Sequence, residues 1–100
     1  MSTQTISRNL VVQRWGTPNT TVGSVNEPRE MAEHGHRFNE KWVYRLAAAS
    51  ADEPSERIIY WQRYDFVGAC LVHKSGTVVE EDLGRQLGHS RDRRYHAPAR

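Results

Sequence analysis

Cysteine is almost missing from this sequence of 100 residues, in which Cys70 is the only one. A single thiol cannot form a disulfide within the chain, and this excludes the class of small secreted domains that depend on internal disulfides. No stretch approaches the roughly 18 apolar residues that a membrane-spanning helix needs. Residues 1–9 are polar and lack the apolar core of a secretory signal. We therefore expect a cytoplasmic protein with no membrane contact.

The larger part of the chain also lacks an excess of positive charge. Residues 1–84 hold 9 Lys and Arg against 11 Asp and Glu, whereas residues 85–100 hold 5 Arg against 1 Asp. The net charge of +2 therefore comes from the C-terminal end. We divide the chain into a flexible N-terminus at 1–7, a single small β-rich domain at 8–84, and a basic, disordered tail at 85–100.

The pattern of apolar residues favours strands. Side chains alternate with a period of two over 41–48, 57–64 and 66–73, and a short returning strand follows at 77–80. Lys74-Ser75-Gly76 between the last two is typical of a three-residue hairpin turn. The apolar residues Leu10, Val11, Val12 and Trp15 predict a first strand over 9–15, and residues 16–26 predict a loop. Asn26 and Gly35 suit the two ends of a short helix over 26–35, and Leu83 and Leu87 predict a last helical turn.

These elements predict an α+β fold that is mostly antiparallel β. We expect a small curled meander sheet or an open barrel of four or five strands, with one short helix.

Motifs of catalysis and metal binding are missing as well. Three of the five histidines, His34, His36 and His73, could pair with Cys70. No glycine elbow or oxyanion-hole pattern accompanies them, however, and the spacing fits no zinc site. We therefore predict no metal, no cofactor and no catalytic residue. A small enzyme or ligand-binding barrel remains an open alternative.

Aromatic residues are what the sequence concentrates. Six rings fall within 25 residues, interleaved with three arginines: Trp42, Tyr44, Tyr60, Trp61, Tyr64 and Phe66, with Arg45, Arg57 and Arg63. Most such rings fill the core of a small β domain, although aromatic and Arg side chains on a sheet also bind nucleic acid. The adjacent Tyr60 and Trp61 point to opposite faces of a strand, so one ring is either covered by the N-terminal loop or part of a binding surface.

We interpret the chain as a small non-enzymatic interaction or regulatory module that docks on a larger macromolecular partner. Its expected binding residues combine directional polar groups with one ring: Glu33, His34, His36, Arg37, Arg45, Trp61 and Arg63. The partner is another protein or a second copy, and a homodimer would form through the 57–64 surface or an open sheet edge. The alternative is nucleic acid, bound by the strand arginines and by Arg91, Arg93 and Arg94.

Overall fold

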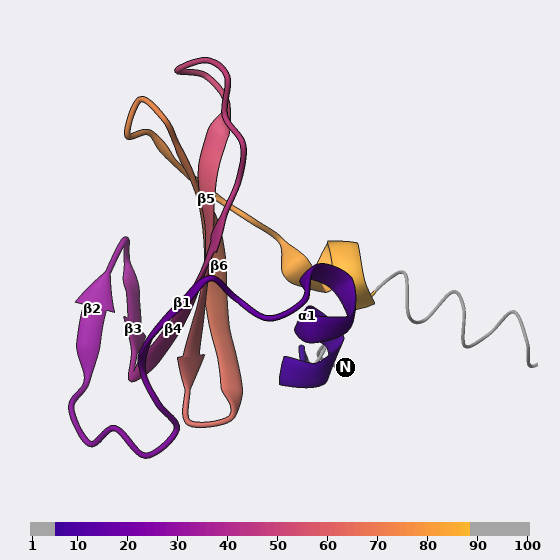
Figure 1. The fold of residues 1–100 in the computed structure, drawn as a ribbon. Coiled ribbons are helices and arrows are strands. Elements are labelled where there is room, and N and C mark those ends of the chain that lie inside the picture. Colours follow the sequence, from indigo (N-terminus) through magenta and orange to yellow (C-terminus); the bar gives the residue numbers. More distant parts are fainter. Residues whose placement is uncertain (1–5, 89–100) are drawn as a thin grey trace, which may run out of the picture.

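The computed structural model describes residues 6–88, which form one α-helix, seven strands and one turn of π-helix (Figure 1). In chain order these are α1 (Arg8–Trp15), β1 (Thr20–Gly23), β2 (Met31–Glu33), β3 (His36–Phe38), β4 (Glu40–Arg45), β5 (Pro54–Gln62), β6 (Asp65–His73), β7 (Val78–Glu80) and η1 (Gly84–Gly88).

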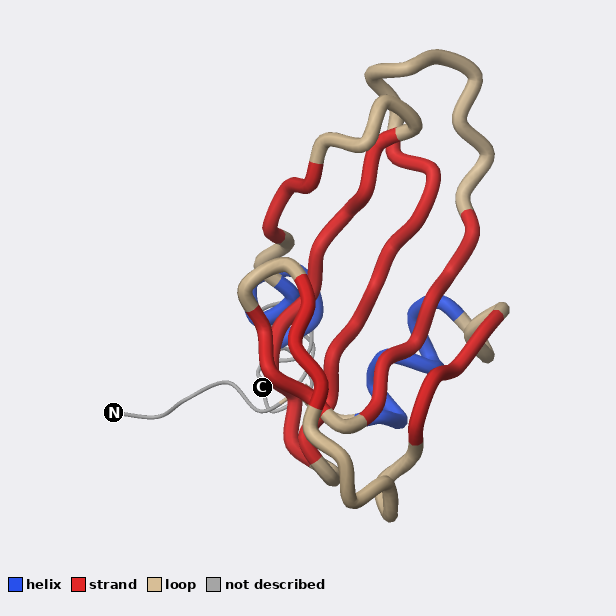
Figure 2. The backbone as a smooth tube through the Cα atoms, turned by 90° about the vertical axis from the view of Figure 1, so that its left-hand side faces the viewer, coloured by secondary structure: helices blue, strands red, loops and turns tan. Residues whose placement is uncertain are grey.

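Five strands make an antiparallel sheet in the order β1-β4-β5-β6-β7, and β2 and β3 form a separate two-stranded hairpin. β1 and β7 lie at opposite edges, so the sheet is open and does not close into a barrel (Figure 2). The predicted α+β class, mostly antiparallel and with one short α-helix, is confirmed.

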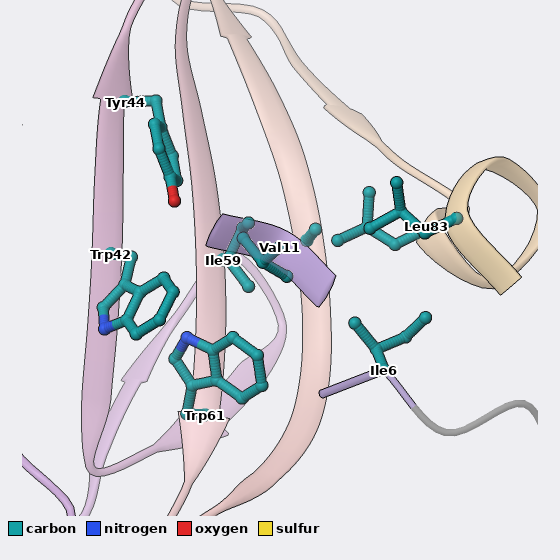
Figure 3. Packing of buried hydrophobic residues seen from close by; sticks show 9 residues of the cluster. Ile6, Val11, Trp42, Tyr44, Ile59, Trp61 and Leu83 are labelled. Atoms are coloured by element: carbon teal, nitrogen blue, oxygen red, sulfur yellow. The ribbon is translucent and has the colours of Figure 1, made fainter. Parts of the chain in front are cut away.

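Each face of this sheet is covered by a different part of the chain. Ile59 and Trp61 point to the face that α1 and η1 cover, where they pack with Val11 and Leu83 (Figure 3). The alternate residues Ile58 and Tyr60 point to the other face, where Phe38 of the β2–β3 hairpin packs on them. The aromatic strands are thus buried on both sides, and the ring of Trp61 is covered by an N-terminal helix.

The strand predicted at 9–15 is wrong, because this segment is the helix α1. Its Ser7 side chain caps the start by accepting a hydrogen bond from the Leu10 N–H at 3.0 Å. Gly16 ends it with a positive φ of 80°, and its N–H donates to the Val12 carbonyl. The β-branched Val11 favoured a strand, but burial of Val11 against the sheet outweighs this small propensity.

The helix predicted at 26–35 is also wrong, because the segment leads into the β2–β3 hairpin. His34 and Gly35, with φ of 51° and 83°, both lie in the left-handed region, which is the geometry of a tight two-residue hairpin turn. Gly35 serves this turn and ends no helix. The loop predicted at 16–26 needs a correction too, since it contains the edge strand β1.

The remaining strand predictions are confirmed with shifted ends, as β4, β5, β6 and β7. The Lys74-Ser75-Gly76 turn has the expected positive φ at Gly76. At the predicted last helical turn, Leu83 directly precedes η1 and Leu87 lies within it. Both are buried with Ile6 in the core on the face of the sheet that α1 covers. The packed core therefore includes Ile6, before the predicted domain of 8–84, and Leu87, after it. Residues 89–100, on which the basic-tail prediction falls, lie outside the described residues.

Candidate functional site

Ionisable side chains gather where the β2–β3 hairpin lies on the sheet, in a group that we call the Tyr60 cluster: Glu33, His36, Lys41, Tyr60, Cys70 and Glu80. The Tyr60 hydroxyl donates a hydrogen bond to Glu33 Oε1 at 2.9 Å and lies 3.9 Å from Cys70 Sγ. Lys41 Nζ donates to the same carboxylate at 2.9 Å. Glu33 is thus held by an ammonium group from β4 and a hydroxyl from β5.

His36 closes the other side of this cluster. Its ring stacks on Tyr60 with the centroids 5.1 Å apart, and its Nε2 lies 2.9 Å from a carboxylate oxygen of Glu80 on β7. The ring lies directly on Gly68, where an added Cβ would come within 2.3 Å of a ring carbon. Gly68 therefore makes the room that lets the hairpin side chain reach across to β7.

The two groups that could act as nucleophiles in the Tyr60 cluster are held in their neutral forms. Burial raises the pKa of the Cys70 thiol. The contact with the Tyr60 hydroxyl lowers it, the nearby carboxylates raise it further, and the pKa remains above its ordinary value. Burial also raises the pKa of Tyr60, as does its hydrogen bond to Glu33. A reactive cysteine needs the opposite environment, one that favours the thiolate. These contacts stabilise the docking of the hairpin on the sheet and do not activate Cys70 or Tyr60.

A second group lies on the helix-covered face, and we call it the cation site: Arg8, Glu40, Trp42, Trp61 and Tyr64. The guanidinium carbon of Arg8 lies 4.9 Å from the ring centroid of Trp42, 5.0 Å from that of Trp61 and 5.7 Å from that of Tyr64. Its Nη2 forms an ion pair of 2.6 Å with Glu40 Oε1. Three aromatic rings and one carboxylate therefore hold a single cation.

Glu40 is the buried anchor of this cation site. Its side chain is 8% exposed, and its second oxygen accepts a hydrogen bond from Trp42 Nε1 at 3.0 Å. Arg8 Nη1 also donates to the carbonyl of Arg63, at 3.2 Å. Figure 3 shows the indole rings of Trp42 and Trp61 on neighbouring strands. Because the Arg8 guanidinium lies over both rings, they form the floor of the site.

The structure brings together only part of the predicted binding set. Glu33 and His36 meet through Tyr60, while Trp61 lies on the opposite face of the sheet. His34 is in the turn of the hairpin, and Arg37 forms an exposed ion pair with Glu30. The predicted residues therefore do not form one continuous site.

The arginines expected to contact nucleic acid are mostly engaged inside the molecule. Arg57 makes two hydrogen bonds of 2.8 Å to the buried Glu81 carboxylate and lies 4.0 Å from the Trp15 ring centroid. Arg63 Nη1 donates to the carbonyls of Val25 and Glu27. Arg45 on β4 and Arg63 in the turn after β5 are exposed, and Arg57 is half-buried. Arg91, Arg93 and Arg94 lie outside the described residues.

Sequence reasoning missed Arg8, Glu40 and Tyr64 as partners in one site. Arg8 and the Arg63 carbonyl are 55 positions apart, and Arg8 and Glu40 are 32 apart, so no local spacing connects them. One signal was available, since Ser7 can cap a helix and a helix would have turned the Arg8 side chain toward the sheet that it covers.

Residues 6–88 contain no group of three or more His, Cys, Asp and Glu side chains that could hold a metal ion. Neither helical segment in the same range is long and apolar enough to cross a membrane. Comparison with protein-family models, with curated proteins and with solved structures yields no match to this chain.

Proposed function

We propose that this chain is a small non-enzymatic interaction module that docks on a larger protein by adding a strand to the free edge of β7. The observation that carries the proposal is the exposure of two adjacent apolar residues on this edge strand, Val78 (36%) and Val79 (43%). Edge strands with apolar side chains and unpaired backbone groups are templates for another strand.

The hydrogen bonds to β6 show which backbone groups of β7 face outward. The N–H of His73 donates to the Thr77 carbonyl, and the N–H of Glu81 donates to the Ala69 carbonyl. In an antiparallel pair, alternate residues bond to the neighbouring strand, so Val79 also faces β6. Val78 and Glu80 therefore turn their N–H and carbonyl groups to the open edge.

Charge indicates the chemistry of the partner. The Glu80 side chain is 61% exposed although it pairs with His36, and Asp82 follows two residues later. An extended segment that alternates apolar and basic residues would place apolar side chains beside Val79 on one face of the sheet and basic side chains beside Glu80 on the other. The neutral forms of Cys70 and Tyr60 support a role in binding and not in catalysis, and the single unpaired thiol supports a cytoplasmic setting.

An array of eight-residue extended peptides, alternating apolar with basic or acidic residues, tests this proposal. We expect the basic series to bind and the acidic series not to bind. Val78→Pro removes an outward N–H and should abolish binding, because proline cannot donate to an added strand. The matched control is Val22→Lys on β1, at the other edge of the sheet, which should bind as the wild type does.

Two results would count against the proposal. The first is peptide binding that Val78→Pro leaves unchanged. The second is a dimer, measured by light scattering during gel filtration, that Val78→Pro converts to a monomer, because the occupant of the edge would then be a second copy.

A further inference from the structure

The cation site opens to solvent on one side. Tyr64 in the turn between β5 and β6 is 68% exposed, and the Arg8 side chain is 24% exposed. The floor is fixed, because Trp61 and Trp42 belong to the core. A cation can therefore approach past Tyr64 without any change in the sheet.

The helix α1 is anchored independently of the Arg8 side chain. Val11 is fully buried against the sheet, and the Tyr44 hydroxyl donates to the carbonyl of Gly16 at 2.7 Å. The Ser7 side chain caps the first turn by accepting from the Leu10 N–H. The Arg8 side chain can thus leave the rings by rotating about its own bonds while α1 stays in place.

The acceptors of the cation site select the kind of cation. Glu40 Oε1 and the Arg63 carbonyl accept hydrogen bonds from two different nitrogens of the Arg8 guanidinium. A planar guanidinium offers five N–H donors in a fixed arrangement, whereas a quaternary ammonium offers none. A methylated ammonium would lie against the rings but would leave the buried Glu40 carboxylate without a hydrogen bond from the ligand.

We propose that Glu40, Trp42, Trp61 and Tyr64 form a binding site for a guanidinium group, and that Arg8 is an internal occupant which the guanidinium of a ligand can replace. The ligand class is an arginine side chain or a small guanidinium compound. This site lies on the helix-covered face, away from the docking edge at β7, so the two proposals fail or succeed separately. Arg8 competes with the ligand for the site. The apparent affinity of the wild type is therefore the intrinsic affinity multiplied by the fraction of molecules in which Arg8 has left the rings.

The test is the thermal stability of the full chain and of Arg8→Ala in increasing concentrations of n-propylguanidinium. We expect a saturable rise in the Tm of Arg8→Ala, half complete at a concentration about tenfold or more below that needed by the wild type. Tetramethylammonium should not reproduce it. An arginine tripeptide with blocked ends distinguishes the two ligand sources, since it stabilises Arg8→Ala only if the site accepts an arginine within a chain.

Two control variants define the site. Arg14→Ala removes another arginine of α1, one that lies over Trp15, and should respond to n-propylguanidinium as the wild type does. The double variant Arg8→Ala with Glu40→Gln should lose the response. Equal shifts in the wild type and Arg8→Ala, or an equal effect of tetramethylammonium, would overturn the proposal.

If Arg8→Ala is unfolded in buffer, its circular dichroism spectrum becomes the readout. Recovery of the folded spectrum in n-propylguanidinium but not in tetramethylammonium is then the expected result, and failure to recover it in either compound contradicts the proposal.

Discussion

The Tyr60 hydroxyl donates a hydrogen bond of 2.9 Å to the Glu33 carboxylate, and this bond joins the central strand of the sheet to the β2–β3 hairpin. We expect Tyr60→Phe to lower the free energy of unfolding by about 1–3 kcal/mol, because a hydrogen bond to a charged group is lost inside a partly buried contact. Urea unfolding measures it. Tyr64→Phe, at a largely exposed ring, is the control and should change stability by less than about 0.5 kcal/mol. Equal stability of Tyr60→Phe and the wild type would show that the bond is not formed.

The lowered pKa of Glu33 makes the stability of the fold depend on pH. Burial raises its pKa, but the hydrogen bonds from Lys41 and Tyr60 and the charge of Lys41 together outweigh burial, so its pKa lies below the ordinary value of 4.5. In the unfolded chain Glu33 takes up its proton at a higher pH than in the folded one. Its contribution to stability is therefore complete above pH 4.5 and is lost as the pH falls through the lower pKa of the folded state.

Urea unfolding at a series of acidic pH values checks this dependence. We expect the wild type to lose stability more steeply below pH 4.5 than Glu33→Gln does. Glu30→Gln removes a carboxylate from an exposed ion pair with Arg37 and should keep the slope of the wild type. If Glu33→Gln keeps that slope as well, the contacts of Glu33 do not favour its ionised form.

Replacing the single buried amide of Asn39 should lower the free energy of unfolding strongly. Its Oδ1 accepts from the Arg63 N–H at 2.9 Å, and its Nδ2 donates to the Glu27 carbonyl at 3.1 Å. We expect Asn39→Ala to cost about 2 kcal/mol or more in unfolding free energy, because the Arg63 N–H loses its acceptor and the Glu27 carbonyl loses one of its two donors. The control is Asn19→Ala, which removes an exposed acceptor of the Arg45 N–H and should cost less than about 1 kcal/mol. Similar losses for the two variants would show that burial of the Asn39 amide adds nothing to stability.

The Cys70 thiol should react slowly with thiol reagents in the native chain. It is fully buried, and burial raises its pKa. We expect an aromatic disulfide reagent at neutral pH to modify the native chain roughly tenfold or more slowly than the chain in denaturant, because the thiolate is the reacting form. Ser75→Cys in a Cys70→Ala background places the only thiol in an exposed turn and should react as a free thiol does. A native Cys70 that matches this control would show that the sheet does not protect it.

The strands of the sheet could be predicted from the sequence more accurately than α1 and the β2–β3 hairpin, which cover its two faces. The two faces of β5 follow from period-two alternation, so the separation of Ile58 and Tyr60 from Ile59 and Trp61 was predictable. The N-terminal segment was not, because Val11 has a strand preference that only tertiary packing overrides. The hairpin was missed because its turn requires positive φ at His34 as well as at Gly35, and residues other than glycine seldom adopt positive φ.

The candidate sites were predictable only in fragments. Glu33 and His36 could be named from their chemistry, but not the Tyr60 ring that joins them, because its placement depends on how the hairpin folds onto the sheet. The cation site depends on contacts between α1 and the β5–β6 turn, more than 50 positions away. Periodicity describes one element at a time and does not pair residues from distant elements.

Hydrogen exchange of the β7 amides, followed by NMR, tests the docking edge most directly. We expect fast exchange at Val78 and Glu80, whose N–H groups face the open edge, and slow exchange at Val79 and Glu81, whose N–H groups bond to β6. A bound basic peptide should then slow exchange at Val78 and Glu80 alone. Protection of Val78 and Glu80 in the free chain would rule out β7 as the docking edge, because this edge would already be covered.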